Sequence, residues 1–431
     1  MRILLRGSYD SFNLGDDLTF IALVRFLRRE FGVAQDALEV YARRRLGSLE
    51  RLVGRDGFCW TEGREIDDLV RARWPTAASR APRVVRRLLL LLTVAALFVH
   101  ICIFRILRKC IAFGDFIPFF AGLDVIHYKG GGYVAGRWRN RLVHEVLTLR
   151  AAKMSNPRLK IVGTGLGLGP FDDRRSSLVA RAFLSKFDTL FVRDRQSLDI
   201  AKSLNPRLDV RCLADDVLLF APMIESMDHR GGGGGKAVAA INLKDFPDHD
   251  YGVIADKVDE LLATLQARGL RVEFFSFSHS PGPCDSRALE SLPLRHRDII
   301  QAVHNPYEEG LDIFLANLGK ARLGFGFAYH FIVVLGMMDV PAVAAYAGGY
   351  YQQKMRSAAE FLDLPLVLSA DDLMGLDVRT VVDQVLRTDV HQGARIKSLH
   401  LEMVREYAAM YGWLVQSAAG TIRADHRCPV G

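Results

Sequence analysis

Five short blocks of the sequence carry side chains typical of a ligand-binding or catalytic site. The first contains Asn13, Gly15, Asp16 and Asp17, between an expected strand and an expected helix. A glycine-containing turn before a helix often binds phosphate, because the free amides of the first helical turn attract anions. Here the two aspartates cap the helix but would repel a phosphate. We therefore expect this block to bind sugar hydroxyls or to supply a carboxylate for proton transfer. A capped helix with no other role is the alternative.

Two glycine-rich blocks also follow expected strands. The run Gly130, Gly131 and Gly132 permits positive φ angles and close backbone approach, so it forms either a tight turn or a ligand contact. The alternating glycines of residues 163–169, which include Gly167, are spaced to present backbone amides to an anion. Both blocks are therefore candidate substrate loops.

Charged residues stand at the ends of later strands. Arg193 would bind a carboxylate or phosphate in a bidentate manner, or form a surface pair with Asp194. Asp215 and Asp216 follow the next strand and form either a capping pair or carboxylates behind the site. His330 opens an expected helix at a strand end, where a cleft is expected. A lone histidine is more often structural than catalytic, but this position makes His330 a candidate catalytic residue.

The elements that must position these residues alternate between short β-type runs and helical patterns. Such alternation predicts an α/β protein with parallel sheets and crossover helices. Five consecutive glycines at 231–235 predict a linker between two Rossmann-like domains, 1–230 and 236–392. A long helical pattern, 393–418, is expected to cross back onto the first domain. We expect the two domains to face one another across a cleft, with the ligand at the carboxyl ends of both sheets.

Length and charge narrow the class of protein. The chain has 431 residues, half of them apolar and a quarter charged, which suggests two or three domains and excludes a disordered or collagen-like chain. Its net charge is +8, but residues 71–109 hold nine basic residues and no acid, so the remainder carries 8 − 9 = −1. A basic excess confined to one segment argues against a nucleic-acid-binding surface.

The same basic segment encloses the most apolar run of the chain, residues 88–104, within an insertion spanning 75–115. As a helix this run would be about 25 Å long, slightly short of a bilayer core. Three interpretations compete: a buried core helix, a single membrane pass, and a helix or shallow hairpin in one leaflet. We favour the last, because a single pass would separate two strands of one sheet and because arginines at both ends would meet anionic headgroups.

The remaining composition bears on compartment and cofactors. The N-terminus resembles a strand rather than a secretory signal, and the six cysteines are scattered without metal-type pairing to histidines. These features predict a cytoplasmic protein at the inner face of the membrane, with no metal site. The oligomeric state is not predicted by the sequence.

Taken together and in this order, the blocks resemble the polysaccharide pyruvyl transferase family. The matching pieces are residues 13–17, 130–132, 167–170, 192–197, 214–216 and Tyr329-His330, followed by Pro341, Tyr346 and Lys354. The likeness covers most of the chain outside the apolar insertion and the glycine linker. Members are similar in fold to two-domain B-type glycosyltransferases. They transfer the enolpyruvyl unit of phosphoenolpyruvate to two hydroxyls of a sugar and form a pyruvate ketal, and several act on envelope or lipid-linked glycans.

The resemblance implies roles for individual residues. Arg193 would bind the carboxylate or phosphate of phosphoenolpyruvate, Lys354 would close the cleft, and His330 would transfer a proton or contact the phosphate. Asn13 and the two following aspartates would face the acceptor or assist proton transfer, with Asp194 as a further candidate base. The other expected substrate contacts are Gly15, Gly131, Gly132, Gly167, Asp194 and Asp216. Phosphoenolpyruvate is the co-substrate, and no separate cofactor is implied.

One departure from the family leaves other functions open. The family usually has Arg two residues before the histidine, whereas this chain has Ala328. Loss of a guanidinium weakens a dianion site unless another cation, such as Arg322 or Arg195, replaces it. The alternatives are a B-type glycosyltransferase that uses a nucleotide-sugar, and a non-catalytic relative that binds a lipid-linked glycan or scaffolds a synthesis complex.

Overall fold

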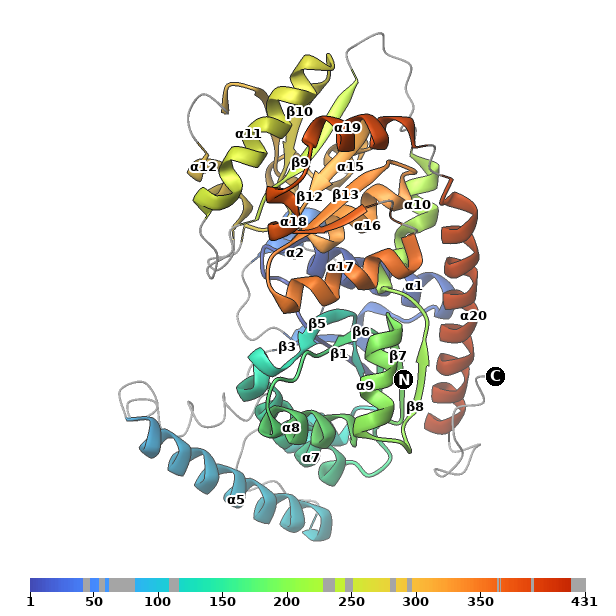
Figure 1. The fold of residues 1–431 in the computed structure, drawn as a ribbon. Helices are drawn as coiled ribbons and strands as arrows, with labels where there is room; N and C mark the ends of the chain where they lie inside the picture. Colours follow the sequence, from blue (N-terminus) through green and yellow to red (C-terminus); the bar gives the residue numbers. More distant parts are fainter. Residues whose placement is uncertain are drawn as a thin grey trace.

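The computed structural model describes residues 1–41, 47–53, 59–61, 82–107, 116–227, 237–244, 251–279, 284–292, 297–362, 364, 366–388 and 391–419. Within these residues the chain forms two α/β lobes, each built on a parallel sheet, with helices against the sheets (Figure 1). We call the described residues up to 227 the first lobe and residues 237–388 the second lobe. The predicted fold class is confirmed. The glycine linker at 231–235 lies outside the described residues, and the predicted domain boundaries stay predictions.

The first lobe contains the larger sheet. Its strands are ordered β3-β2-β1-β4-β6-β7-β8, with β5 paired to β6, and every pair is parallel. Strands β1, β4 and β7 are buried throughout, as expected where helices cover both faces of a parallel sheet. The bounds are β1 Ile3–Arg6, β2 Leu38–Tyr41, β3 Cys59–Thr61, β4 Val125–Tyr128, β5 Gly131–Val134, β6 Lys160–Leu168, β7 Thr189–Val192 and β8 Asp209–Cys212.

The second lobe has the smaller sheet, in the order β11-β10-β9-β12-β13-β14, again with every pair parallel. Its central strand β9 is completely buried. The bounds are β9 Val238–Asn242, β10 Arg271–Phe275, β11 Ile300–His304, β12 Ala321–Gly326, β13 Ala342–Tyr346 and β14 Leu366–Ser369.

The helices of the first lobe include the two that matter most for the site, α1 and α7. They are α1 Leu14–Phe31, η1 Gln35–Ala37, α2 Ser48–Val53, α5 Arg83–Leu107, α6 Phe116–Ala121, η2 Gly136–Trp138, α7 Arg139–Ser155, α8 Arg174–Leu184, α9 Arg195–Leu204, η3 Asp216–Phe220 and α10 Ala221–Ser226. Those that follow are α11 Tyr251–Ala267, α12 Asp285–Ser291, α14 Pro306–Glu309, α15 Leu311–Leu318, α16 Tyr329–Met337, α17 Gly349–Leu362, α18 Ala370–Met374, α19 Val378–Arg387 and α20 Gly393–Ala418.

Helix α1 joins the cores of the two lobes. Its middle is largely apolar, its charged residues gather towards the two ends, and most of its residues are buried, because η3 and α16 cover it in addition to the sheet. It ends at Gly32 in the left-handed conformation, which lets the Gly32 amide donate to the carbonyls of Arg28 and Leu27. The first residues of α1 are therefore held firmly at the boundary between the lobes.

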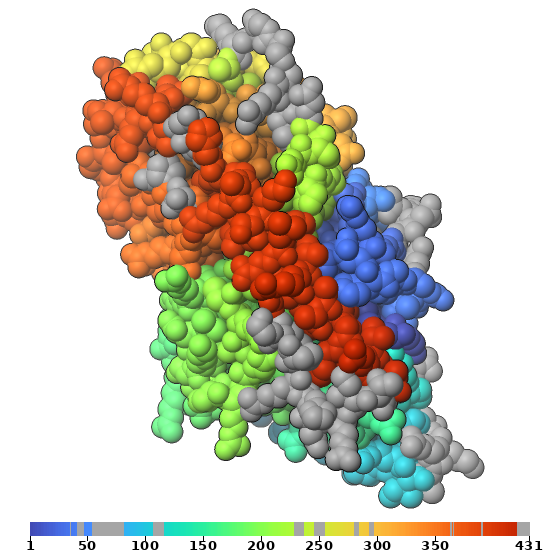
Figure 2. Space-filling model, turned by 90° about the vertical axis from the view of Figure 1, so that its right-hand side faces the viewer, coloured from blue at the N-terminus to red at the C-terminus, as the bar shows by residue number. Residues whose placement is uncertain are grey.

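The C-terminal helix α20 runs along both lobes (Figure 2). At its start, the carboxylate of Asp339 accepts from the backbone amides of Gln392 and Gly393, which ties α20 to the second lobe. Towards its end, Tyr407 and Tyr411 are fully buried in the first lobe. The helix thus connects the two lobes.

Helix α5 lies on the outside of the first lobe, across α7 (Figure 1). One face packs into the core of that lobe, with Leu97 and Ile101 fully buried. Among the described residues it is the one helix long and apolar enough to cross a membrane: Arg83–Ile106 has a mean hydropathy of 2.5, and only 28% of that window is buried.

The structure corrects one element assignment. Residues 163–169 were expected to form a loop, but β6 continues to Leu168, and Gly131 and the residues after it form a further strand, β5. The glycines of β6 make room for side chains: a Cβ at Gly167 would lie 2.8 Å from the Arg193 guanidinium, and one at Gly165 would lie 2.8 Å from Asp216. Steric space rather than anion binding explains this glycine pattern.

Candidate active site

A cleft of about 240 Å³ lies between the two lobes. The loops and helices after β1, β5, β9, β10 and β13 line it, so the carboxyl ends of both sheets face it, as expected for α/β folds. The lining residues are Ser8, Ser11, Asn13, Asp16, Gly132, Tyr133, Arg137, Trp138, Arg141, Lys244, Ser278, Tyr350, Tyr351 and Lys354.

The loop between β1 and α1 is fixed by bonds to the second lobe. The amide of Leu14 donates to the carbonyl of Phe277 (2.8 Å), and the amide of His279 donates to the carbonyl of Phe12 (2.7 Å). Asp10 and Phe12 both adopt positive φ angles, which non-glycine residues rarely do. Such backbone strain persists only where the surroundings enforce it, and it is concentrated at functional sites.

Gly15 and His330 meet where the first turns of α1 and α16 approach each other. A Cβ at Gly15 would overlap the imidazole, with His330 Nδ1 as its nearest atom. Only glycine therefore allows His330 to occupy this position, and the predicted pair is brought together from opposite lobes. The His330 side chain is 9% exposed and does not line the cleft.

Asp16 and Lys354 both lie close to the glycine block Gly130–Gly132. A Cβ at Gly131 would be 3.7 Å from Asp16 Oδ1, and a Cβ at Gly132 would be 2.9 Å from Lys354 Cε. The carbonyl of Gly132 also accepts a 2.8 Å hydrogen bond from the hydroxyl of Tyr350. Burial, with the nearby Arg193 charge, lowers the pKa of Lys354 to about 8. A carboxylate from the first lobe and an amine from the second therefore share the cleft beside two adjacent glycines.

Cations and aromatic rings dominate the cleft. Among the described residues, four basic side chains line it (Arg137, Arg141, Lys244 and Lys354), against one acid, Asp16. The Arg137 guanidinium lies 5.0 Å from the ring centre of Tyr350 and 5.3 Å from that of Trp138. Such stacking holds an arginine in place while leaving its donors free for an anion. The cleft is thus suited to a small ligand with several negative charges.

Arg193 and His330 both contact Asp215, behind the cleft. Arg193 Nη1 is 3.3 Å from Asp215 Oδ2, and His330 Nε2 is 3.8 Å from Asp215 Oδ1. Burial alone would raise the pKa of Asp215, but contact with His330 and the Arg193 charge hold it below its ordinary value. Arg193 also lies 3.5 Å from Asp194, whose carboxylate caps α9 by accepting from the Ser197 amide. Two carboxylates thus neutralise the predicted anion-binding arginine, which does not line the cleft.

Asp17 and Asp216 likewise lie outside the cleft and are fully buried. Asp17 accepts hydrogen bonds from the Asp10 amide (2.7 Å) and from the Tyr307 hydroxyl of the second lobe (2.9 Å). Burial raises the pKa of Asp17 to about 7 and that of Asp216 to about 6. Asp216 accepts from the Gly130 amide, Thr164 and Tyr407. Both carboxylates bind protein groups rather than face the cleft.

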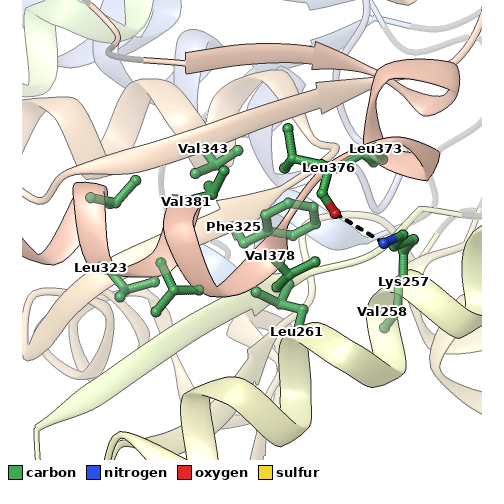
Figure 3. A pocket seen from close by; sticks show the side chains of 12 residues that line it. Lys257, Val258, Leu261, Leu323, Phe325, Val343, Leu373, Leu376, Val378 and Val381 are labelled. Carbon is green, nitrogen blue, oxygen red and sulfur yellow. Dashed lines mark hydrogen bonds between the residues drawn. The ribbon is translucent and has the colours of Figure 1, made fainter.

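A second cavity lies inside the second lobe, between α11, α19 and the sheet (Figure 3). Its lining is apolar apart from Lys257, which donates to the carbonyl of Leu376, as Figure 3 shows. Its volume is about 30 Å³, enough for a single water. A cavity of this size and lining does not bind a charged substrate. Two further pockets, of about 490 and 240 Å³, lie against α10 and α20. The cleft is the candidate site because it brings together the sequence-predicted residues Asn13, Asp16, Gly132 and Lys354.

Comparison with known proteins decides the family. A sequence profile described as polysaccharide pyruvyl transferase matches residues 13–344, which is most of the chain. The chain belongs to the polysaccharide pyruvyl transferase family. It is therefore a transferase, and its family implies a glycan acceptor. No protein of curated function matches the sequence.

Comparison with solved structures identifies the broader fold class of this pyruvyl transferase family member. The UDP-GlcNAc 2-epimerase of Methanocaldococcus jannaschii aligns with a TM-score of 0.52 at 10% identity, over 94% of this chain and 99% of that one. Arabidopsis thaliana UGT89C1 complexed with UDP gives 0.51 at 9% identity, over 97% and 99%. S. aureus MnaA with UDP gives 0.51 at 11% identity, over 96% and 98%. These likenesses show a GT-B-like fold.

The position at which the family usually has arginine is buried in this chain. Ala328 is 7% exposed, and its amide donates to the side chain of Asn242 (2.9 Å). The expected substitutes, Arg322 and Arg195, are both exposed and do not line the cleft, so the expectation that either replaces it is wrong. The cations that do line the cleft include Arg137, Arg141 and Lys244.

Sequence reasoning missed several residues of this pyruvyl transferase cleft. Arg137, Trp138 and Arg141 follow the glycine block directly, and this clustering of cations with an aromatic residue was the available signal.

Lys129 is fully buried and donates to the Asp16 carbonyl (2.8 Å) and to Thr19 (2.6 Å), which fixes the start of α1. No cluster of three or more metal-ligating side chains occurs in the part of the chain that the structure describes.

Proposed function

We propose that this chain transfers the enolpyruvyl unit of phosphoenolpyruvate to two hydroxyls of a sugar in its glycan acceptor, within the cleft between the lobes. The observation that carries this proposal is the set of cleft side chains: four cations, one carboxylate and four aromatic rings. Phosphoenolpyruvate places a phosphate and a carboxylate on a three-carbon skeleton, so it requires several cations at close range. The apolar face of a sugar ring packs well on aromatic side chains.

Arg137, Lys244 and Lys354 are the proposed donor-binding residues. They come from both lobes, and no carboxylate of the described residues lies within ion-pair distance of any of them. Helix α17 also directs its N-terminus at the cleft through Tyr350 and Tyr351, and the free amides there favour an anion. The family role of Arg193 is then replaced: Arg193 holds Asp215 next to His330.

The proposed reaction requires one acid and one base. A proton added to C3 turns the methylene of phosphoenolpyruvate into a methyl group and leaves positive charge at C2. One sugar oxygen bonds to C2, the bond from C2 to the phosphate oxygen breaks, and a second hydroxyl closes the ketal. Of the two hydroxyl protons, one balances the proton on C3 and the other leaves with inorganic phosphate. Proton transfers of this kind each accelerate a reaction by about 10²–10⁴-fold.

Asp16 is the proposed base, because it is the carboxylate that lines the cleft. Lys354 would neutralise the leaving phosphate and, with a pKa of about 8, is acidic enough to give it a proton. Burial lowers the pKa of His330, so its imidazole is neutral in the empty site. The negative charge of the donor would raise that pKa. Because His330 does not line the cleft, its role as the acid requires donor binding to open a path from the cleft to its imidazole.

The direct test supplies phosphoenolpyruvate and a lipid-linked glycan extract to the purified chain. The expected result is release of inorganic phosphate, seen by phosphorus NMR, with a matching gain of one pyruvate ketal in the mass of the glycan. Consumption of a nucleotide-sugar instead of phosphoenolpyruvate would overturn the proposal in favour of glycosyl transfer. Binding of the glycan without turnover of either donor would overturn it in favour of a non-catalytic role.

We further propose that α5 attaches the protein to an anionic membrane surface. Its outer face exposes a stripe of apolar side chains at helical spacing, while its inner face is packed on the first lobe. The exposed stripe consists of Val84, Leu88, Leu91, Leu92, Val99 and Ile106, each more than half exposed. Exposed arginines flank the stripe, three near its start and Arg105 near its end.

A helix in the plane of one leaflet accounts for both faces of α5. A spanning orientation would strip Leu97 and Ile101, which are fully buried, from the core of the first lobe. An in-plane orientation keeps that packing and buries the outer stripe in lipid, with arginines at the headgroups contributing about 1 kcal/mol each. This arrangement would bring a lipid-linked acceptor to the lobe that carries Arg137 and Trp138, because α5 packs on α7, which directly follows them.

A further inference from the structure

A buried hydrogen-bond network lies directly beneath the glycine block Gly130–Gly132. Asp216 is its centre: one carboxylate oxygen accepts from the Gly130 amide (2.6 Å) and from Thr164 (3.0 Å), and the other accepts from the Tyr407 hydroxyl of α20 (2.5 Å). All three side chains are completely buried. The carboxylate is therefore held by three protein donors and no solvent.

The hydrogen bonds of this network allow only one assignment of donors and acceptors. Burial lowers the pKa of His127 to about 3, so the imidazole is neutral and carries one proton. Thr164 gives its hydroxyl proton to Asp216, so it must accept from His127 Nε2 (2.7 Å). His127 Nδ1 then accepts from the hydroxyl of Tyr411, on the same helix as Tyr407. Every proton in the chain of bonds points towards the Asp216 carboxylate.

We infer that Tyr407 is a positioning residue for the glycine block, acting through Asp216. The amide of Gly130 is tied to the same carboxylate that Tyr407 holds, and the next two glycines lie under Asp16 and Lys354. Tyr407 is itself fixed by stacking on Phe191, with ring centres 5.6 Å apart. The C-terminal helix thus fixes the position of the glycine block, although Tyr407 lies 191 residues after Asp216 in the sequence.

This inference rests on the proposed function for its effect on turnover, but its structural part does not. Without the Tyr407 hydroxyl, Asp216 loses one of three donors, and the restraint on the Gly130 amide weakens. A displacement of the glycine block moves Asp16 relative to Lys354, and small misplacements of reacting groups reduce turnover strongly. The effect should be larger in kcat than in the KM for phosphoenolpyruvate, because only Lys354 of the three proposed donor-binding residues packs on the block.

The test compares Tyr407→Phe with Tyr411→Phe. Both remove a fully buried hydroxyl from the same helix, but that of Tyr411 bonds to His127 and is two hydrogen bonds further from Asp216. Hydrogen–deuterium exchange should show that the Gly130 amide exchanges about tenfold faster in Tyr407→Phe and at the unaltered rate in Tyr411→Phe. The kcat should fall about tenfold in the first variant and less than twofold in the second.

The exchange measurement separates failure of this inference from failure of the proposed function. If Tyr407→Phe leaves exchange at Gly130 unchanged, or if both variants change it equally, the inference is overturned whatever the activity. If the natural chain turns over no phosphoenolpyruvate while the exchange rates differ as stated, the positioning role stands and the proposed function fails.

Discussion

His330 packs directly against the α-carbon of Gly15, so that the first turns of α16 and α1 touch across the boundary between the lobes. This contact requires the absence of a side chain at Gly15. It places the histidine immediately behind the helix turn that carries Asp16 into the cleft. The proposed acid and base are thereby neighbours although more than 300 residues separate them in sequence.

Replacing Gly15 with alanine should displace His330. In an exposed helix this change would stabilise the protein by up to about 1 kcal/mol, so any loss here reports the steric conflict. We expect kcat to fall at least tenfold and Tm to decrease. The matched control is Gly412→Ala in α20, where an added Cβ meets no atom within 4 Å, and there neither quantity should fall. Unchanged activity in Gly15→Ala would show that the His330 position does not matter.

Asp16 and Asp17 should separate into a catalytic and a structural residue. Asp16→Asn is expected to lower kcat about 100-fold or more with little change in Tm, since Asp16 lines the cleft. Asp17→Ala removes the acceptor of the Asp10 amide and the Tyr307 hydroxyl, and should lower the free energy of unfolding by about 2–4 kcal/mol. Chemical denaturation together with initial rates distinguishes the two effects. The reverse assignment of effects would contradict the geometry.

The pH dependence of kcat/KM should report Lys354. Burial lowers the pKa of Lys354 to about 8, so its positive charge is present below that pH and is lost as pH rises through it. We expect kcat/KM for phosphoenolpyruvate to fall between about pH 8 and 9, approaching tenfold per pH unit. Lys354→Arg keeps the charge over this range, so the fall should disappear in that variant. An identical alkaline fall in both proteins would assign it to another group.

Polar substitutions in the outer stripe of α5 should release the protein from membranes. Leu88→Gln, Leu92→Gln and Val99→Gln together alter only exposed side chains, so Tm should not change. Co-sedimentation with vesicles containing anionic lipid is expected to be lost. Leu178→Gln with Ile313→Gln, which are exposed apolar residues elsewhere, should leave vesicle binding intact. Persistent binding after the α5 substitutions would place the membrane contact elsewhere.

The sequence predicted the fold and the positions of the site blocks better than it predicted side-chain roles. Gly15 and His330 were found because their neighbours form motifs at strand ends, and parallel sheets bring such ends together. Lys354 was found through the family resemblance. The roles of adjacent acidic residues are harder to predict from sequence. Successive residues on a helix point about 100° apart, so Asp16 enters the cleft while Asp17 turns into the core.

The sequence alone could not show which charged groups are neutralised by partners far away in the chain. Arg193 has the spacing of an anion-binding residue, but Asp215 occupies it after folding. Asp216 resembles a cleft carboxylate, yet its partner Tyr407 lies 191 positions away. Arg137 belongs to a cluster of cations with Trp138, but Lys244 carries no motif, and only the packing of the lobes shows that the two line one cleft.

Calorimetric titration with phosphoenolpyruvate tests the central claim most directly, because the claim is that the cleft cations bind this donor. The natural chain should bind it, and Arg137→Ala should weaken binding at least tenfold. Arg139→Ala should bind as the natural chain does, since Arg139 pairs with Asp173 and does not line the cleft. Equal affinity in all three proteins, or no binding by the natural chain, would contradict the account.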